Sequence, residues 1–208
     1  ATRHAIPGGG ALRVLEVGAG AGSATHALLD SLAAAGRLAG PATFLVTEPV
    51  PFLRRRAERS LRGRAGPVPS FAALDIDRDW ADQGAAPETF DLVYAVNVLH
   101  VARDLLFSLR QAWTALRPGG WLVLGECVRP YPGRPVAAEL IFQILERFAD
   151  VSTDPEIRPH HGFLAPEHWR RALDAAGFAP VEVVPDLIKI RDIYPRFSTG
   201  ALCGQRPT

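Results

Sequence analysis

The sequence predicts an α/β fold in which helices cover both faces of a seven-stranded, mostly parallel sheet. Short apolar runs alternate with longer segments of helical periodicity along nearly the whole chain. The connections are short, as expected where each helix returns the chain to the start of a parallel neighbour. The last two strands have no clear helix between them, so we expect an antiparallel last strand at the edge of the sheet.

In the first half of the chain, each predicted strand leads into a helix or a loop. The first strand has a buried pattern, and Ser23 is a suitable N-cap for the helix after it. Pro51 suits the first turn of the second helix. The predicted elements are strand 11–18, helix 23–36, strand 42–48, helix 51–63, and strands 68–75 and 89–96.

In the second half, proline and glycine mark where the elements begin and end. Pro118 and two glycines close the helix that precedes the fifth strand, and Gly177 closes the last helix. The predicted elements are helix 103–120, strand 121–127, helices 135–150 and 165–177, and strands 181–187 and 197–205.

Length and composition indicate one domain. The chain has 208 residues, of which 48% are hydrophobic, enough for a single core. Residues 1–10, with a proline and three glycines, are expected to be a linker, and residues 11–208 a single domain. A net charge of +1 indicates no strong attraction to nucleic acid or membranes. The sequence has no signal peptide or membrane-spanning run, and Cys127 and Cys203 form no C-x-x-C pair, so we expect a cytoplasmic protein.

The loop LEVGAGAGS, residues 15–23, joins the first strand to the first helix. Gly18, Gly20 and Gly22 alternate, and without Cβ atoms they allow a tight turn and a close approach of a ligand to the backbone. In an open α/β sheet, this crevice binds nucleotide-like ligands. A tight turn by itself explains one glycine but not three.

The glycine spacing differs from that of dinucleotide sites, which follow G-x-G-x-x-G, so a nicotinamide oxidoreductase is a distant alternative. With Glu16 in front, the pattern E-x-G-x-G-x-G resembles the first motif of class I S-adenosylmethionine-dependent methyltransferases. The segments FDLVYAVNVLH and ALRPGGWLVLGE resemble later motifs of the same family, so the match runs from Leu12 onward. The resemblance implies the Rossmann-like fold of that class, S-adenosylmethionine as cofactor, S-adenosylhomocysteine as product, and Glu16 near the cofactor's ammonium group.

Two further acids lie where this family holds its cofactor. Glu48 ends the second predicted strand, where a carboxylate accepts hydrogen bonds from both ribose hydroxyls. Asp75 ends the third, where a carboxylate accepts from the adenine amino group and the backbone of Ile76 reads the ring edge. Each acid alone would be an ordinary turn residue, but together after this loop they support a cofactor site.

NVLHVARD and LVLGE together resemble the methyltransferase domains embedded in modular polyketide synthases, which carry a histidine after strand four and a glutamate at the end of strand five. The matching residues are His100 and Glu126. Neighbouring strand tips are close, so the side chains should meet, with His100 as general base and Glu126 fixing its tautomer. The alternative is that His100 caps the next helix or is satisfied in the core. Asn97 is expected to shape the pocket or contact the cofactor's methionine part.

A second group of histidines, His160, His161 and His168, is not expected to bind metal, because adjacent histidines point in different directions. His160 or His161 could line the substrate entrance, although a surface loop is the simpler interpretation. His168 is most simply a helix residue.

The resemblance to polyketide methyltransferases leaves the acceptor atom open. Two features favour oxygen: the chain begins almost at its first strand, without the large helical segment of carbon-methylating domains, and FSTGALCGQRP resembles the last strand of oxygen-methylating ones. The implied substrate is a β-hydroxyl or enol on an acyl carrier protein, delivered by a phosphopantetheine arm whose phosphate could meet Arg129, Arg134 or Arg158. Carbon methylation of a β-ketoacyl chain is the alternative. The implied partners are that carrier protein and neighbouring synthase domains.

Two further possibilities stay open at this stage. A non-catalytic scaffold domain would keep the fold and lose the cofactor site, which the intact loop and acids argue against. A free-standing small-molecule methyltransferase would use the same fold and the same cofactor.

Overall fold

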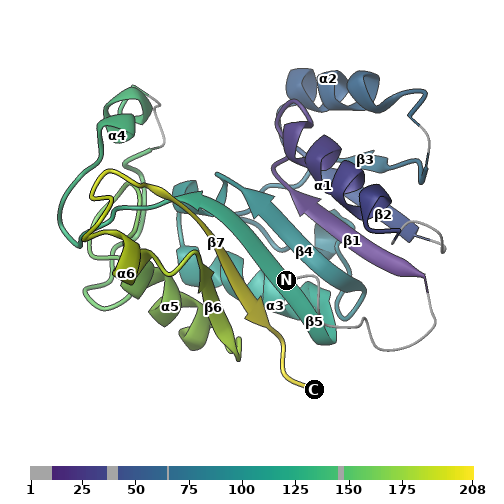
Figure 1. Ribbon diagram of the computed structural model, residues 1–208. Helices are drawn as coiled ribbons and strands as arrows, with labels where there is room; N and C mark the ends of the chain where they lie inside the picture. Colours follow the sequence, from purple (N-terminus) through teal and green to yellow (C-terminus); the bar gives the residue numbers. More distant parts are fainter. Residues whose placement is uncertain (1–10, 37–41, 65, 145–147) are drawn as a thin grey trace.

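The computed structural model describes residues 11–36, 42–64, 66–144 and 148–208, and it has the predicted α/β architecture (Figure 1). The predicted linker over residues 1–10 lies outside the described residues. The strands are β1 (Leu12–Val17), β2 (Ala42–Thr47), β3 (Ser70–Ala72), β4 (Phe90–Val96), β5 (Leu116–Cys127), β6 (Val181–Val184) and β7 (Thr199–Gln205). The helices are α1 (Ser23–Ala34), α2 (Pro51–Leu61), α3 (Leu105–Ala115), α4 (Ala137–Phe142), α5 (Pro166–Ala175) and α6 (Leu187–Ile190), with 3-10 turns η1 (Ala81–Gln83) and η2 (Leu99–Val101).

The seven strands form one sheet in the order β3-β2-β1-β4-β5-β7-β6. The first five strands in the sequence are parallel, and β7 alone runs antiparallel to its neighbours β5 and β6. The chain adds β2 and β3 on one side of β1 and then crosses to place β4 on the other. The carboxyl ends of β1 and β4 therefore flank the crevice where an open α/β sheet binds its ligand.

Helices cover both faces of the sheet, as the sequence predicts. On one face, Val14 and Phe44 pack with Leu29 of α1 and Leu61 of α2. On the other, the larger core brings strand residues against α3 and α5, including the fully buried Trp169. Alternate residues of β1 enter the two cores, since successive side chains of a strand point to opposite faces.

The structure corrects the predicted element boundaries at three places. The third strand ends at Ala72 rather than Asp75, because the Gln83 side chain binds both the N–H and the carbonyl of Asp75 in place of a neighbouring strand. Ser23 is not the N-cap of α1; Gly22 is, with no side-chain cap. The helix predicted over 135–150 is the short α4 in the described residues, which exclude 145–147.

Two further differences concern β5 and the end of the chain. The segment RPGG belongs to β5, because Pro118 lacks an N–H and disfavours helix at the residue before it, so the chain becomes extended directly after Ala115. The short helix α6 between β6 and β7 was missed by the sequence analysis. None of the helices in the described ranges is both long and apolar enough to cross a membrane.

Candidate active site

The glycine loop after β1 uses its three glycines in different ways. All three have positive φ values: 69° at Gly18, 56° at Gly20 and 93° at Gly22. A Cβ on Gly18 would lie 2.5 Å from the side chain of Val98, and one on Gly22 would lie 3.3 Å from the Cβ of Ala57, so both positions are closely packed. A Cβ on Gly20 would meet nothing within 4 Å. Gly20 is therefore the glycine with open space for a ligand beside its backbone.

Glu48 lies at the tip of β2 and fastens this loop. One carboxylate oxygen accepts from the Gly20 N–H at 2.9 Å, and the other accepts from the Val50 N–H at 2.9 Å. The predicted ribose contact therefore comes from a carboxylate that already holds Gly20 in place. Each oxygen keeps a second lone pair, so a pair of hydroxyl groups fits the donor set.

Glu16 is 2% exposed in β1 and contacts α1. Its carboxylate accepts from the Thr25 hydroxyl at 2.5 Å and lies beside Tyr94. Burial raises the pKa of Glu16, and the hydrogen bond from Thr25 opposes that shift. Glu16 therefore links β1 to the first turn of α1, which positions the N–H groups behind the glycine loop. Its predicted contact with an ammonium group stays a prediction.

The predicted adenine contacts lie beyond β3. Asp75 is half-buried, and its carboxylate accepts from the Asp77 N–H at 3.0 Å. The next residue, Ile76, is also half-buried, and its carbonyl accepts from the Ser108 hydroxyl at 3.0 Å. With Gln83 holding the Asp75 backbone, these contacts fix the turn in one conformation.

Asn97 directly follows β4 and has a left-handed conformation, with φ of 55°. Asparagine tolerates this conformation better than most residues. Its N–H donates to the Gly125 carbonyl at 2.7 Å, and its side-chain oxygen accepts from the Cys127 N–H at 3.0 Å. Asn97 therefore joins the tips of β4 and β5, and it lines a groove of about 340 Å³ that also reaches Glu126 and β7. The reversal of the chain at Asn97 sends the following residues across the end of β5.

His100 and Glu126 are in contact. The Nδ1 atom of His100 lies 2.8 Å from one carboxylate oxygen of Glu126, and the other oxygen accepts from the N–H groups of Val98 and Leu99 at 3.2 and 3.0 Å. His100 is 1% exposed and Glu126 is 2% exposed. Because the carboxylate accepts, Nδ1 carries the proton of the neutral imidazole and Nε2 carries the lone pair.

Val98 connects the glycine loop to this pair. Its side chain packs on the bare Cα of Gly18, and its N–H donates to Glu126. The turn η2, which carries His100, begins one residue later. The loop at the end of β1 and the imidazole after β4 are therefore linked by one residue.

Three phenylalanine rings surround the imidazole. The ring centroids of Phe142, Phe148 and Phe163 lie 5.7, 6.3 and 4.9 Å from that of His100. The Nε2 atom of His100 is buried and has no hydrogen-bond partner among the described residues. Buried polar atoms in native proteins nearly always have a partner, so an isolated lone pair here needs an explanation. A reacting group of a substrate would supply one.

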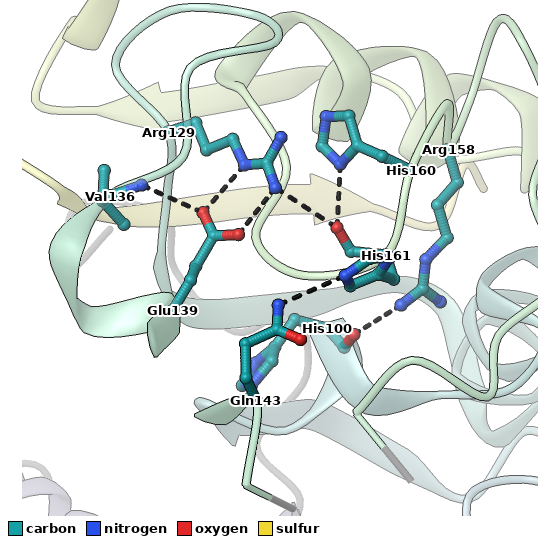
Figure 2. Close-up of polar contacts among 8 residues, drawn as sticks. All are labelled: His100, Arg129, Val136, Glu139, Gln143, Arg158, His160 and His161. Atoms are coloured by element: carbon teal, nitrogen blue, oxygen red, sulfur yellow. Dashed lines mark hydrogen bonds and ion pairs between the residues drawn. The ribbon is translucent and has the colours of Figure 1, made fainter. Parts of the chain in front are cut away.

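An ion pair holds α4, which carries Phe142, against the end of β5 (Figure 2). Arg129 donates to both carboxylate oxygens of Glu139, at 2.8 and 2.6 Å, and one of these oxygens also accepts from the Val136 N–H. Arg129 also donates to the carbonyl of His161 at 3.3 Å. The suggestion that Arg129 and Arg158 meet a phosphate is therefore wrong, because both guanidinium groups are buried on protein acceptors. Arg134 is exposed.

The other histidines form a partly buried cluster. The rings of His160 and His168 lie 6.1 Å apart, and burial lowers the pKa of both. His168 is on α5, as predicted, and is buried. His161 lies 3.2 Å from the Gln143 side chain, so it belongs to the contacts around α4. Within the described residues, no group of three or more His, Cys, Asp or Glu side chains is placed to hold a metal ion.

The sheet order, with its antiparallel β7, and the glycine loop at the switch point are those of a class I methyltransferase. The methyltransferase domain family matches residues 15–122. The chain belongs to this family, and its cofactor is S-adenosylmethionine.

The relatives that this chain matches in sequence are synthases much longer than the chain itself. The chain is 37% identical over 175 residues to fumosorinone synthetase of Cordyceps fumosorosea, which covers 83% of the chain and 4% of the relative. It is 36% identical over 190 residues to the non-reducing polyketide synthase dpmpA of Macrophomina phaseolina, which covers 88% of the chain and 8% of the relative. The chain therefore spans only a small part of the relatives that it matches.

Solved structures give the same fold. The CurJ carbon methyltransferase superposes with a TM-score of 0.81 and 27% identity, covering 97% of this chain and 50% of that chain. The trans-methyltransferase CalH, in complex with S-adenosylhomocysteine, gives 0.73 and 26%, covering 94% of this chain and 51% of that chain. The chain is thus similar to methyltransferase regions of polyketide synthases.

Several residues of the site were missed by the sequence analysis. Its prediction that His100 and Glu126 meet agrees with the geometry, whereas the contacts of Thr25, Val98 and the three phenylalanines were not anticipated. The phenylalanines lie in loops and a short helix, far from any motif, so the sequence contains no periodic signal for them. Val98 lies inside a motif but resembles an ordinary apolar strand residue.

Proposed function

We propose that this domain transfers a methyl group from S-adenosylmethionine to the α-carbon of a β-ketoacyl chain within a polyketide synthase. His100 acts as the general base and Glu126 as its orienting acid. The observation that carries the proposal is a buried imidazole whose Nδ1 is held by a carboxylate and whose Nε2 has no hydrogen-bond partner among the described residues. That geometry suits removal of a proton next to the cofactor crevice.

The residues of the pair divide the proton transfer between them. S-adenosylmethionine supplies an electrophilic methyl group with a good leaving group, so the acceptor is what the protein must activate. Nε2 of His100 takes the proton from the carbon between two carbonyls, and Glu126 stabilises the imidazolium that results. The phenylalanine rings exclude water, which would otherwise compete for Nε2. A positioned base of this kind typically contributes about 10²- to 10⁴-fold in rate.

The same proposal assigns the cofactor contacts to residues that follow the first three strands. Gly20 leaves open space at the loop, and the Glu48 carboxylate beside it accepts the ribose hydroxyls. Asp75 and the backbone of Ile76 hold the adenine. Asn97 borders the methionine part of the cofactor, and the N–H groups behind Gly18 and Gly22 face it from the first turn of α1. Glu16 acts through Thr25 on that same turn.

We infer that carbon, rather than oxygen, is the acceptor. The CurJ protein, to which this chain is 27% identical, is a carbon methyltransferase by its name. The position at which this sequence begins does not favour oxygen, because the chain spans only 50% of that protein's chain. Oxygen stays the second candidate, supported by the resemblance of residues 197–207 to oxygen-methylating domains and by a base that serves either acceptor.

The partners follow from the same proposal. The acceptor is carried by the phosphopantetheine arm of an acyl carrier protein, and residues 11–208 act as one methyltransferase core beside other synthase domains. The dpmpA relative, a polyketide synthase by its name, supports this setting. A scaffold domain without activity is the competing idea, and failure to bind S-adenosylmethionine in calorimetry would favour it.

Mass spectrometry tests the acceptor directly. The domain is incubated with S-adenosylmethionine and either β-ketoacyl or β-hydroxyacyl carrier protein. We expect one added methyl on the β-ketoacyl substrate, located at the α-carbon by fragmentation, and none on the β-hydroxyacyl substrate. A methyl ether on the β-hydroxyacyl substrate would establish oxygen instead.

A further inference from the structure

Arg158 is the most buried arginine among the described residues, 2% exposed, and it contacts the turn that carries His100. Its two terminal nitrogens donate to the carbonyl oxygens of His100 and Ala102, each at 2.5 Å (Figure 2 shows the first). A planar guanidinium presents its donors as a fixed fork, so two contacts set both the position and the direction of what it holds.

The carbonyl of His100 depends on this arginine because no backbone N–H of the described residues donates to it. The 3-10 turn is closed by the N–H groups of Val101 and Ala102, which donate to the carbonyl oxygens of Val98 and Leu99. In a continuing turn the N–H of Arg103 would reach the His100 carbonyl, but it donates to the Asp77 carboxylate at 2.7 Å instead. Without the Arg158 side chain, the His100 carbonyl would be a buried acceptor with no donor in the part of the chain that the structure describes.

The loop that carries Arg158 is held in one conformation. The backbones of Asp154 and Arg158 exchange two hydrogen bonds of 2.9 Å, and the Asp154 carboxylate accepts from the N–H groups of Glu156 and Ile157 at 2.9 Å. A tight turn of this kind projects the arginine from a fixed base into the interior. The long side chain therefore loses little further freedom when it binds the two carbonyls.

The charge of Arg158 is balanced by acids around it. Burial lowers the pKa of Arg158 to about 10, and the carboxylates of Asp77, Asp104 and Glu126 oppose that shift. At neutral pH the group is still a cation. Because Glu126 is among these acids, the arginine and the His100–Glu126 pair share one electrostatic environment.

We propose that Arg158 is a positioning residue for methyl transfer: it holds the His100 main chain so that Nδ1 stays on Glu126 and Nε2 faces the acceptor. It acts through His100 and does not itself touch substrate. The proposal rests on the proposed role of His100 as the base. A displacement of about 1 Å at a reacting group can lower a rate about 10²-fold, so control of the turn has a measurable effect.

The test compares R158M and R158K with the unchanged chain and with H100Q. Turnover is measured with a β-ketoacyl carrier-protein substrate, cofactor affinity by calorimetry, and the low-field N–H proton of the His100 imidazole by NMR. We expect R158M to lower kcat about 10- to 100-fold with cofactor affinity within twofold, and to shift or broaden the imidazole resonance. R158K should recover part of kcat, since one ammonium reaches only one carbonyl.

The matched control is R103M. Arg103 is close to His100 in the sequence, but its side chain is mostly exposed and pairs with Asp150 at 3.3 Å. We expect its kcat and its imidazole resonance to be unchanged. If R158M and R158K keep kcat within twofold and the resonance stays in place, while H100Q is inactive, the positioning role is wrong and the base assignment survives. Full activity of H100Q would remove both. If thermal denaturation shows that R158M does not fold, R158K decides the question by the same measurements.

Discussion

The proposed cofactor half and the proposed acceptor half of the site are built differently. In the first, Gly20, Glu48 and Asp75 follow three successive strands, and their contacts are mostly with backbone N–H groups of adjacent turns. In the second, His100 meets Glu126, three phenylalanines and an arginine 58 residues away in sequence, nearly all buried. A loop with backbone donors suits binding, and a buried, oriented side chain suits proton transfer. Substitutions should therefore change affinity in one half and turnover in the other.

The largest effect expected is at the base. H100A removes the only atom proposed to take the acceptor's proton, so kcat should fall about 10²- to 10⁴-fold. The cofactor affinity should stay within twofold, because His100 is separated from the glycine loop by Val98. Single-turnover kinetics and calorimetry measure the two quantities. A variant that keeps its turnover would show that the buried imidazole is structural.

E126Q should be nearly as severe, for a different reason. A glutamine amide that keeps its oxygen on Val98 and Leu99 turns its NH₂ toward Nδ1, which must then accept. The proton moves to Nε2, and the lone pair is lost from the side that faces the acceptor. We expect kcat to fall about 10²- to 10⁴-fold, as for removal of the orienting acid in a serine protease triad. If a pH profile of kcat shows that E126Q keeps the turnover of the unchanged chain, Glu126 does not set the tautomer of His100.

E48Q tests the cofactor half and should show the opposite pattern. The neutral amide accepts fewer and weaker hydrogen bonds from ribose hydroxyls, and it loses one of its two contacts with Gly20 and Val50. The Kd for S-adenosylmethionine should rise about tenfold, equivalent to about 1.4 kcal/mol. With saturating cofactor, kcat should change less than threefold. An equal fall in kcat would mean that the two halves are not separable.

G18A and G20A separate packing from ligand access inside the loop. Both force a side chain into positive φ, at about 1 kcal/mol or more, but the Cβ at position 18 also collides with Val98 at 2.5 Å. G18A should lower the free energy of unfolding by about 2–3 kcal/mol, and G20A by about 1 kcal/mol. Urea denaturation measures the free energy of unfolding. Calorimetry should show that G20A weakens cofactor binding although it lowers stability only slightly. The reverse order of stabilities would refute the packing role of Gly18.

The smallest expected effect concerns Glu16 and pH. Because burial raises the pKa of Glu16 above 4.5, the folded protein binds the proton more tightly than the unfolded chain does. At neutral pH the carboxylate is charged, and its burial destabilises the folded protein. The penalty disappears as pH falls through the raised pKa toward 4.5. E16Q should therefore melt about 2–4 °C higher at pH 7.5, with the difference shrinking on acidification. E182Q, at an exposed position of β6, serves as the control and should show no such trend.

The sequence predicted most of the fold because strand and helix periodicities are local. The sequence also placed Glu48 correctly at the end of β2, whereas Asp75 lies three residues beyond β3, and the cofactor contacts of both stay predictions. The contact between His100 and Glu126 followed from the closeness of neighbouring strand tips. The extent of β3 and β5 was wrong where a side chain or a proline replaced the expected backbone pattern, as at Gln83 and Pro118.

By itself, the sequence determined the alternation of strands and helices, the glycine loop and the order of polar residues at the strand ends. These depend on residues close together in the chain. Only the tertiary structure decided that His100 is enclosed by Phe142, Phe148 and Phe163, and that Arg158 holds its main chain. Those contacts join segments with no shared periodicity, brought together when the core packs and each buried polar group must find a partner.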